Sequence, residues 1–338
     1  MSHVGRLAFE PGRWTPPPPP RLEGPYARNT RLSGATLWAT PGAGPEDVVI
    51  DARGRVVTGI VTGEILAFPS NSRAGDPTVL ASTGGRPLGI ERDAEGDGLI
   101  VCDAHRGLLR LEASGRLETL VDAFEGEPLR FTNNAAVASD GTIYFSDTST
   151  KYSIDTYRRD LLEHQPRGRL FAYDRRTRET RLVLGGLYFA NGVALSHDES
   201  FVVVAQTGSY DLKRVWLKGA RSGEVDTFIE NLPGFPDNVS SSGTGIFWVA
   251  LPAPRHRPLD MLLPRPFLRS MVAALPDALQ PQPPRYGFVL GIDEQGKVVH
   301  NLQDPSGRVA HLTGAREHDG RLFVGSLQDS AVAVIDLA

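Results

Sequence analysis

The 338-residue sequence predicts an all-β fold, a six-bladed β-propeller with a helical insertion in the region of the fifth and sixth blades. Three observations predict it. Pairs of short apolar strands flank a polar turn six times along the chain. The repeats are about 40–57 residues apart, except for one longer gap, which is a spacing typical of propeller blades. Each repeat has room for four strands, which neither a solenoid nor a sandwich explains.

The inner hairpin of each repeat is predicted from its turn, because Asp-Gly and related turns between apolar strands are strong hairpin signals. These turns lie at 51–54, 93–96, 140–141, 197–200, 241–243 and 318–320. Outer hairpins are predicted at 170–183 and 288–299. The last strand, 331–337, is expected to pair with a strand near 35–40, which would close the ring and remove unpaired sheet edges.

Two segments fall outside this pattern. Residues 1–34 contain the proline run 16–20 and are predicted to form an extended arm before the propeller at 35–338. The long gap, 252–284, is predicted to be a helical insertion, because Pro266 suits a first helical turn. Apolar residues then follow at helical spacing: Phe267, Leu268, Met271, Val272 and Leu275.

The insertion has three interpretations, namely a lid or substrate wall, a plain packing cover, and a surface that contacts a membrane. The last rests on its four arginines, Arg255, Arg257, Arg265 and Arg269.

Composition excludes several classes of partner and location. The net charge of −4, with both signs interspersed, offers no basic stripe for nucleic acid. A single cysteine, Cys102, forms no internal disulfide and is expected to be a small buried apolar residue. No apolar stretch resembles a signal peptide or the ~20 residues of a membrane span, so a cytoplasmic location is expected. The oligomeric state is left open.

Four segments with side-chain oxygens each lie just before the innermost strand of a different repeat, at 44–46, 131–134, 189–192 and 234–238. In a propeller these strands begin around one end of the central channel. Calcium takes about six to eight oxygen ligands, and Glu46 and Asp237 would balance its charge while Asn133 and Asn191 add neutral oxygens. Each residue alone suits a turn or a solvated surface, but their recurrence favours a calcium site. Zinc is disfavoured, because no Cys or His cluster has suitable spacing.

Several motifs together resemble those of the strictosidine-synthase-like family, which is related to the gluconolactonases and paraoxonases. They are 86–90 (RPLGI), 147–151 (DTSTK), 168–170 (GRL), 189–193 (FANGV), 234–238 (GFPDN) and 317–320 (EHDG). The resemblance covers nearly the whole chain and implies a six-bladed propeller with a catalytic calcium ion. It implies Glu46, Asn133, Asn191 and Asp237 as ligands, with Asn134 and Asn238 beside them at the substrate.

Two departures from the family pattern bear on the activity. The acid of strictosidine synthase, which condenses an amine with an aldehyde, corresponds to Thr313, so this reaction is disfavoured. The two histidines of paraoxonases correspond to Leu88 and His105. His105 is therefore one candidate general base and Asp237 a second, although His105 also suits a strand-end histidine bonded to a backbone carbonyl. His318 is expected to be a turn residue.

The resulting hypothesis is calcium-dependent hydrolysis of a small lactone or aryl ester by water. Apolar walls for the substrate would come from the insertion and from Phe131, Phe189, Phe235 and Trp248. The alternative is a non-catalytic propeller that binds a ligand or a protein and in which calcium is structural.

Overall fold

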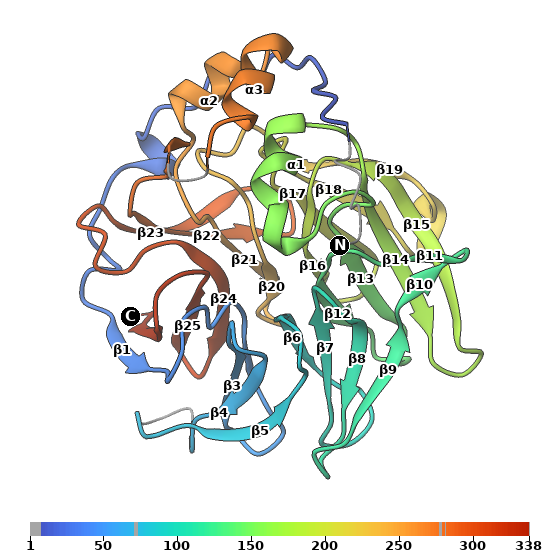
Figure 1. Cartoon of the computed structure of the whole chain (residues 1–338). Helices are drawn as coiled ribbons and strands as arrows, with labels where there is room; N and C mark the ends of the chain where they lie inside the picture. Colours follow the sequence, from blue (N-terminus) through green and yellow to red (C-terminus); the bar gives the residue numbers. More distant parts are fainter. Residues whose placement is uncertain (1–7, 71–73, 277–278, 281, 338) are drawn as a thin grey trace.

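A computed structural model describes residues 8–70, 74–276, 279–280 and 282–337. Six four-stranded antiparallel sheets surround a central channel, which confirms the predicted six-bladed propeller (Figure 1). Within the first five blades the strands follow the chain from the channel outward. The innermost strands of neighbouring blades contact one another around the ring.

The first three blades arise from the first half of the chain. Blades 1 to 3 are β2 (Val48–Ile50), β3 (Val56–Gly59), β4 (Glu64–Ala67) and β5 (Thr78–Ser82); β6 (Pro87–Arg92), β7 (Leu99–Asp103), β8 (Gly107–Leu111) and β9 (Leu117–Val121); and β12 (Thr132–Val137), β13 (Ile143–Asp147), β14 (Gly168–Asp174) and β15 (Glu179–Leu187). A small hairpin links blades 2 and 3, formed by β10 (Ala123–Phe124) and β11 (Glu127–Pro128).

The remaining blades follow in the same way. Blades 4 to 6 are β16 (Ala190–Leu195), β17 (Phe201–Gln206), β18 (Asp211–Trp216) and β19 (Val225–Ile229); β20 (Val239–Ser241), β21 (Ile246–Ala250), β22 (Gly287–Asp293) and β23 (Val298–Asp304); and β24 (Leu312–His318), β25 (Arg321–Ser326), β26 (Ala331–Asp336) and β1 (Thr36–Ala39). Blade 6 therefore combines both ends of the chain. As predicted, β1 pairs with β26, with Thr36 opposite Val334.

Short helices connect or cover the strands. They are η1 (Gly24–Tyr26), η2 (Ile154–Thr156), α1 (Tyr157–Glu163), η3 (Gly219–Arg221), α2 (Arg257–Leu262) and α3 (Pro266–Ala273). The insertion forms α2 and α3, which lie together at one end of the molecule with α1 beside them (Figure 1). No helix in the described part of the chain is both long and apolar enough to cross a bilayer.

The core is divided into clusters between neighbouring blades, because each sheet packs one face against the preceding sheet and the other face against the following sheet. Six of the apolar clusters correspond to the six blade interfaces. Strand β17 is buried along its whole length, which explains its apolar run from Phe201 to Ala205. Cys102 is fully buried between blades 2 and 3, as expected.

Candidate metal centre

The inner strands are irregular where they begin, at the end of the channel that the helices cover, here called the upper end. The register slips in β6, β12, β16 and β24, and each slip leaves two residues outside the regular ladder. Such bulges re-aim side chains. In blades 1 and 5 the corresponding residues lie just before β2 and β20. The first residue of each pair defines a six-membered ligand ring, formed by Glu46, Leu88, Asn133, Asn191, Asp237 and Thr313.

The two asparagines of the ligand ring are oriented by the same device. Asn133 Nδ2 donates to Thr148 Oγ1 at 3.0 Å, and the Thr148 hydroxyl donates to the Ala190 carbonyl of the next blade at 2.7 Å. Asn191 Nδ2 likewise donates to Thr207 Oγ1 at 3.1 Å. The Thr207 hydroxyl donates to the carbonyl of Pro236 at 2.7 Å. Each threonine therefore fixes an amide and joins two blades.

This arrangement leaves oxygen atoms without partners. Among the described residues, Oδ1 of Asn133, Asn191, Asp237 and Asn238 is buried and accepts no hydrogen bond. Buried polar atoms are nearly always satisfied, so several orphaned oxygens at one place require an explanation. A bound ligand with positive charge or donor groups supplies one.

The charges of the two carboxylates of the ligand ring are only partly compensated by the protein. Burial, and then the neighbouring Asp47, raises the pKa of Glu46 to about 7, although Arg86 and a hydrogen bond from Asn238 oppose this rise. Burial and then Glu46 raise the pKa of Asp237 well above its usual value. A cation between them would offset both effects.

The donor set matches a hard cation. Two carboxylates and neutral amide oxygens are the ligands that calcium prefers. In the described part of the chain, no group of three or more His, Cys, Asp or Glu side chains is placed to hold a metal ion, so any metal at the ligand ring needs the asparagines. The residues present therefore fit calcium better than zinc.

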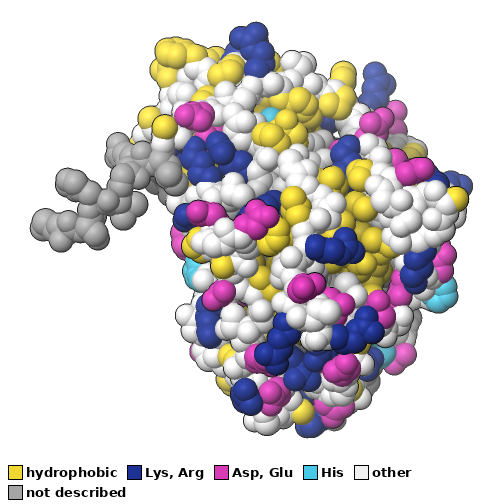
Figure 2. Space-filling model, turned by 90° about the vertical axis from the view of Figure 1, so that its right-hand side faces the viewer, with side chains coloured by type: hydrophobic (Ala, Val, Ile, Leu, Met, Phe, Trp, Pro, Cys, Tyr) yellow, Lys and Arg dark blue, Asp and Glu magenta, His cyan; other side chains and the backbone are white. Residues whose placement is uncertain are grey.

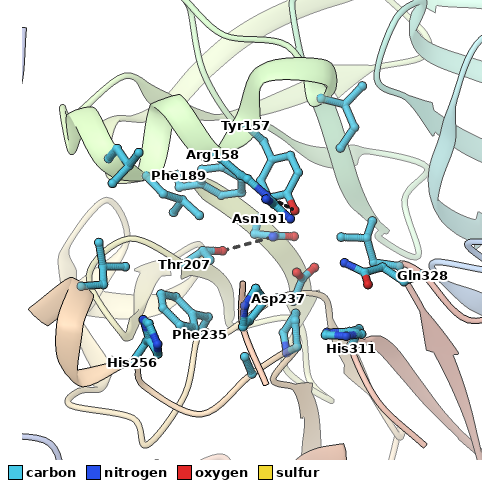
Figure 3. A pocket seen from close by; sticks show the side chains of 18 of the residues that line it. Tyr157, Arg158, Phe189, Asn191, Thr207, Phe235, Asp237, His256, His311 and Gln328 are labelled. Carbon is cyan, nitrogen blue, oxygen red and sulfur yellow. Dashed lines mark hydrogen bonds between the residues drawn. The ribbon is translucent and has the colours of Figure 1, made fainter. Parts of the chain in front are cut away.

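Above the ligand ring lies a cavity of about 190 Å³, which Figure 3 shows from close by. Glu46, Leu88, Asn133, Asn191 and Asp237 line its floor. An engineered cavity of roughly 150 Å³ holds benzene, so the volume suits a small ring. The walls are mostly apolar and include Phe131, Phe189 and Phe235 from the channel side, Tyr157 and Leu161 from α1, Leu259 and Leu262 from α2, and Val272 from α3.

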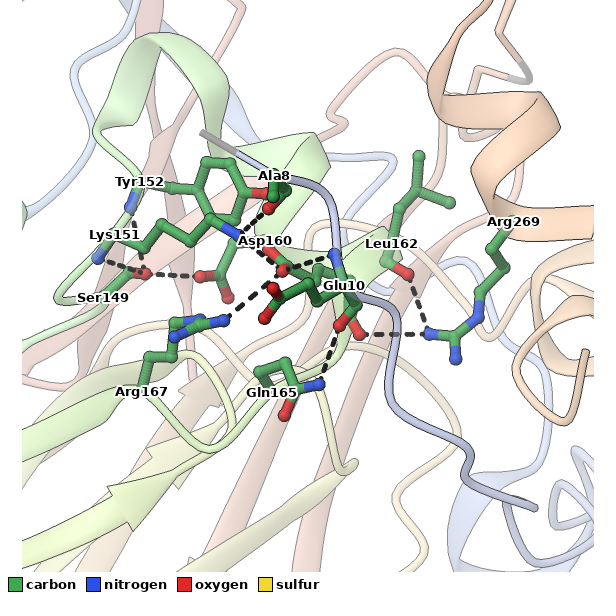
Figure 4. Close-up of polar contacts among 11 residues, drawn as sticks. Ala8, Glu10, Ser149, Lys151, Tyr152, Asp160, Leu162, Gln165, Arg167 and Arg269 are labelled. Atoms are coloured by element: carbon green, nitrogen blue, oxygen red, sulfur yellow. Dashed lines mark hydrogen bonds and ion pairs between the residues drawn. The ribbon is translucent and has the colours of Figure 1, made fainter. Parts of the chain in front are cut away.

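The insertion is therefore a wall of the cavity, and two of its arginines are internal. Arg269 is completely buried and donates to the carbonyl of Leu162 at 2.7 Å, at the end of α1 (Figure 4). Arg255 pairs with Asp260 at 2.9 Å and lies over the Tyr210 ring. Contrary to expectation, these two arginines are not available to a membrane surface.

Helix α1 is tied to the N-terminal arm by a cluster of polar residues (Figure 4). The Glu163 side chain accepts a bond from Lys151 Nζ at 2.5 Å and another from the backbone N–H of Glu10 at 2.8 Å. Trp14 of the arm stacks on His164, with ring centroids 4.4 Å apart. The N-terminal arm thus holds α1, the helix that forms part of the cavity wall, in place.

Two predicted substrate residues lie within the channel wall rather than in the cavity. Asn134 Nδ2 donates to Asp47 Oδ2 at 3.2 Å, and Asn238 Nδ2 donates to Glu46 Oε2 at 3.1 Å. Neither asparagine is among the residues that line the cavity. Both orient carboxylates because their side chains point between blades.

Trp248 and His105 are also outside the cavity. Trp248 is fully buried between blades 5 and 6, where its indole N–H donates to Glu317 at 2.7 Å. Because side chains alternate between the two faces of a strand, the Trp248 side chain points into the interface between these blades. The His105 imidazole is 41 % exposed, and its Nε2 is 3.2 Å from Asp155 Oδ2 on the surface. The structure therefore does not bring His105 to the predicted metal ligands.

Two histidines that the sequence analysis missed do line the cavity, His256 and His311. His311 has a sequence signal that could have identified it. Phenylalanine precedes three ring residues by two positions, at 131, 189 and 235, and His311 precedes Thr313 by the same distance. Thr313 itself donates to the Glu46 carbonyl at 2.7 Å and does not line the cavity.

Comparisons with known proteins agree with the motifs. The strictosidine synthase family model matches residues 133–220, and the model of the strictosidine synthase-like N-terminal region matches residues 24–68. The adipocyte plasma membrane-associated protein of Rattus norvegicus is 35 % identical over 94 % of this chain and 90 % of its own length. Strictosidine synthase-like protein 6 of Arabidopsis thaliana is 34 % identical over 94 % of this chain and 85 % of its own length.

Solved structures share the fold at low sequence identity. A gluconolactonase from Xanthomonas campestris has a TM-score of 0.65 and 18 % identity, with 91 % of each chain covered. Regucalcin from Agrobacterium tumefaciens, described as a calcium-binding protein, has a TM-score of 0.59 and 15 % identity over 88 % of this chain and 93 % of its own. The chain therefore shares the propeller fold of these structures.

Proposed function

The chain belongs to the strictosidine synthase-like family, and from this premise we propose that it is a calcium-dependent hydrolase of small lactones or aryl esters. The observation that carries the proposal is the set of buried oxygens without partners on Asn133, Asn191 and Asp237. They form, with Glu46, the floor of an apolar cavity. A polar floor beneath apolar walls is the usual composition of a small-molecule site.

When bound, calcium would supply Lewis acidity toward the substrate's carbonyl oxygen. Four members of the ring, Glu46, Asn133, Asn191 and Asp237, would hold the ion, with Glu46 and Asp237 providing the charge. Leu88 has no donor atom and the Thr313 hydroxyl is bonded to the Glu46 carbonyl, so neither is a ligand. Phe131, Phe189 and Phe235 would bind the apolar part of the substrate and restrict access of bulk water. Asp237 would serve as an ion ligand.

The structural neighbours support the reaction class in outline. Among them are a gluconolactonase and a luciferin-regenerating enzyme, the latter with a TM-score of 0.65 and 13 % identity. The relatives of higher identity have names that state no reaction. The substrate class is therefore inferred from the cavity and the ring.

The test is hydrolysis of a panel of lactones and phenyl acetate before and after calcium chelation. Activity should disappear with calcium and return when calcium is restored. Asn191→Ala should lose the activity as well, because it removes one ring oxygen and its tie to Thr207. Full activity after complete calcium removal, or in Asn191→Ala, would contradict the proposal.

Two alternatives are distinguished by the same panel. A non-catalytic binding propeller would turn over no ester, while calcium would still raise its melting temperature. A condensing enzyme of the strictosidine synthase type would need an acid at position 313, where the Thr313 hydroxyl is engaged with the Glu46 carbonyl. That engagement is the specific observation against condensation.

We also propose that the insertion rests on a lipid surface. Large apolar side chains are exposed on and beside α2 and α3: Met261, Phe267, Leu268, Met271, Leu275 and Leu279. Figure 2 shows hydrophobic side chains gathered with Lys and Arg at the upper end of the molecule, where Figure 1 has these helices. Exposed Arg257 and Arg265 would favour anionic lipid. Sedimentation with anionic vesicles should be lost in Phe267→Ser combined with Met271→Ser.

A further inference from the structure

His311 occupies a distinctive position in the channel wall. The backbone carbonyls of Phe131, Phe189 and His311 accept equivalent hydrogen bonds, from the N–H groups of Thr148, Thr207 and Leu327 at 2.9, 3.1 and 3.0 Å. The three residues therefore have the same place in blades 3, 4 and 6. At this level, two positions before the ligand ring, blades 3, 4 and 5 present phenylalanine to the cavity and blade 6 presents an imidazole.

Blade 6 also lies between the two blades that supply carboxylates. Within the ligand ring, the Thr313 carbonyl accepts a bond from the backbone N–H of Asn238 at 2.9 Å, and the Thr313 hydroxyl donates to the Glu46 carbonyl at 2.7 Å. His311, two residues earlier, is thus flanked by the blades of Asp237 and Glu46. Figure 3 draws its ring among the side chains around the cavity, together with Asp237 and Gln328.

The backbone of His311 is held in an uncommon conformation. Its φ is 52°, in the left-handed region that few non-glycine residues adopt. Phe189, at the equivalent position of blade 4, has the same conformation with a φ of 59°, so the geometry of these two blades at this level fixes the backbone and the side chain is what distinguishes blade 6. His311 is only 5 % exposed, yet it lines the cavity.

Burial, and then the positive charges around His311, favour its neutral form. Burial, and then Arg285, lowers the pKa of His311, and Arg158 on α1 acts in the same direction. Asp329 and the carbonyl of Pro252 oppose this lowering. Glu46 and Asp237 face the same cavity from the floor. A neutral imidazole has one nitrogen that accepts a proton.

We infer that His311 is the general base of the proposed hydrolysis. This inference rests on the proposed function and assigns the proton transfer within it. The water oxygen forms a bond to the carbonyl carbon while one of its protons moves to the free imidazole nitrogen. The bond between the carbonyl carbon and the ring or aryl oxygen then breaks, and the imidazolium returns the proton to that oxygen. The products are a hydroxy acid, or an acid and a phenol, and neutral His311.

The other histidines provide internal comparisons. His105 is on the surface beside Asp155 and serves as a control outside the cavity. His256 lines the cavity near α2 but belongs to the insertion, so it is expected to act as a wall. Replacing His256 should change KM more than kcat, whereas replacing His311 should change kcat.

The experiment compares the wild type with His311→Asn, His311→Gly, His256→Gln and His105→Gln. Asn and Gly both tolerate the left-handed backbone, so these variants should fold. With calcium saturating, His311→Asn should lower kcat about 10²–10⁴-fold, the range of general base catalysis, with KM and calcium affinity within about threefold. His105→Gln should match the wild type. Added imidazole should restore part of the activity of His311→Gly.

Two pH measurements complete the test. The wild-type kcat should decrease as the pH is lowered through the pKa of His311, because the imidazole gains a proton. This acidic limb of the pH profile should be absent from the residual activity of His311→Asn. Histidine NMR of the calcium-loaded protein, with the His311 signal identified by its loss in His311→Asn, should show a neutral ring at pH 7.

The outcomes separate the two proposals. A wild type that hydrolyses no lactone or ester contradicts the proposed function, and the role of His311 falls with it. An active wild type whose His311→Asn variant keeps its kcat and acidic limb contradicts only the role of His311. A cationic His311 at pH 7 in an active protein contradicts it as well.

Discussion

Two levels of the same channel both bury carboxylates, but they satisfy them differently. At the level below the ligand ring, Asp47 accepts bonds from the N–H groups of Val48 at 2.8 Å and Ile90 at 3.2 Å, and from Asn134 at 3.2 Å. Arg316 compensates its charge and also pairs with Glu91 at 2.7 Å. In the ligand ring, the carboxylates have an arginine only at Glu46, and several oxygens have no partner.

The comparison distinguishes a level whose carboxylate is satisfied by the protein from a level at which we propose that a cation binds. Burial raises the pKa of Asp47 to about 6, with Arg316 and two backbone N–H groups limiting the rise. The pKa of Glu46 reaches about 7, because Asp47 adds to the effect of burial. The protein's own donors complete the lower level, whereas the upper level keeps buried oxygens without partners, which the proposed cation would satisfy. Stability and ion binding should therefore respond to different substitutions.

Breaking the lower level should have the largest effect on stability. Arg316→Met would leave buried Asp47 and partly buried Glu91 without their cation. Breaking a fully buried pair costs about 3–5 kcal/mol, and we expect a smaller loss here because both Arg316 and Glu91 are partly exposed. Chemical denaturation should detect this loss, with exposed Arg92→Met as the matched control. If Arg316→Met unfolds like the control, the lower level is not held together by charge.

Removing a carboxylate from the upper level should weaken calcium binding while stabilising the calcium-free protein. Asp237→Asn should weaken calcium binding about 100-fold or more, because ligand charge sets calcium affinity. The calcium-free protein should melt at a higher temperature than the wild type, since a buried carboxylate beside Glu46 is removed. Calorimetric titration and thermal melting measure the two effects. Unchanged calcium affinity would remove Asp237 from the site.

Calcium itself should stabilise the wild type. A ligand at about 100 times its Kd contributes about 2.7 kcal/mol to folding if it binds only the native state. The melting temperature should therefore rise with calcium and fall on chelation. Magnesium should act more weakly, because it demands a smaller octahedral site. The same rise in Asp237→Asn would locate the stabilising ion elsewhere.

A smaller effect is expected from the threonine that orients a ring amide. Thr207→Val keeps the shape but removes the hydroxyl that accepts from Asn191 and donates to Pro236. Residues that orient metal ligands typically contribute about 10–100-fold in affinity, and we expect the lower end of that range. Thr227→Val, on the exposed surface of blade 4, is the control for hydroxyl loss. Equal calcium affinity in both variants would show that Asn191 needs no such support.

Much of the fold could be predicted from the sequence, because blade strands have local signals. The turn at 140–141 between two apolar strands, and the terminal strand at 331–337, are recognisable without a structure. Helix α1 was missed, since its seven residues contain charged side chains and lie between strands. Its stability comes from tertiary contacts with the arm and with Arg269, which no local pattern reveals.

The site was predicted less evenly. Asn133, Asn191, Asp237 and Glu46 follow a recurrent position, so the sequence predicted their shared level in the ring. Trp248 and His105 were chosen for their chemical type, and strand alternation and a surface turn direct them elsewhere. Arg255 and Arg269 were taken for surface residues because charge alone does not report burial.

The sequence by itself determined the six-fold repeat, the closing strand and the oxygen-bearing positions, because each has a local signal of apolar strand residues and polar turn residues. Only the tertiary structure decided which oxygens remain without partners, which histidine reaches the cavity and which arginines are internal. Those properties depend on which side chains meet in the folded chain, within a blade or between blades, as in the bond from Thr148 to Ala190 of the next blade. The physical reason is that a buried polar group finds its hydrogen-bond or charge partner among its neighbours in space, which the order of residues in the chain does not reveal.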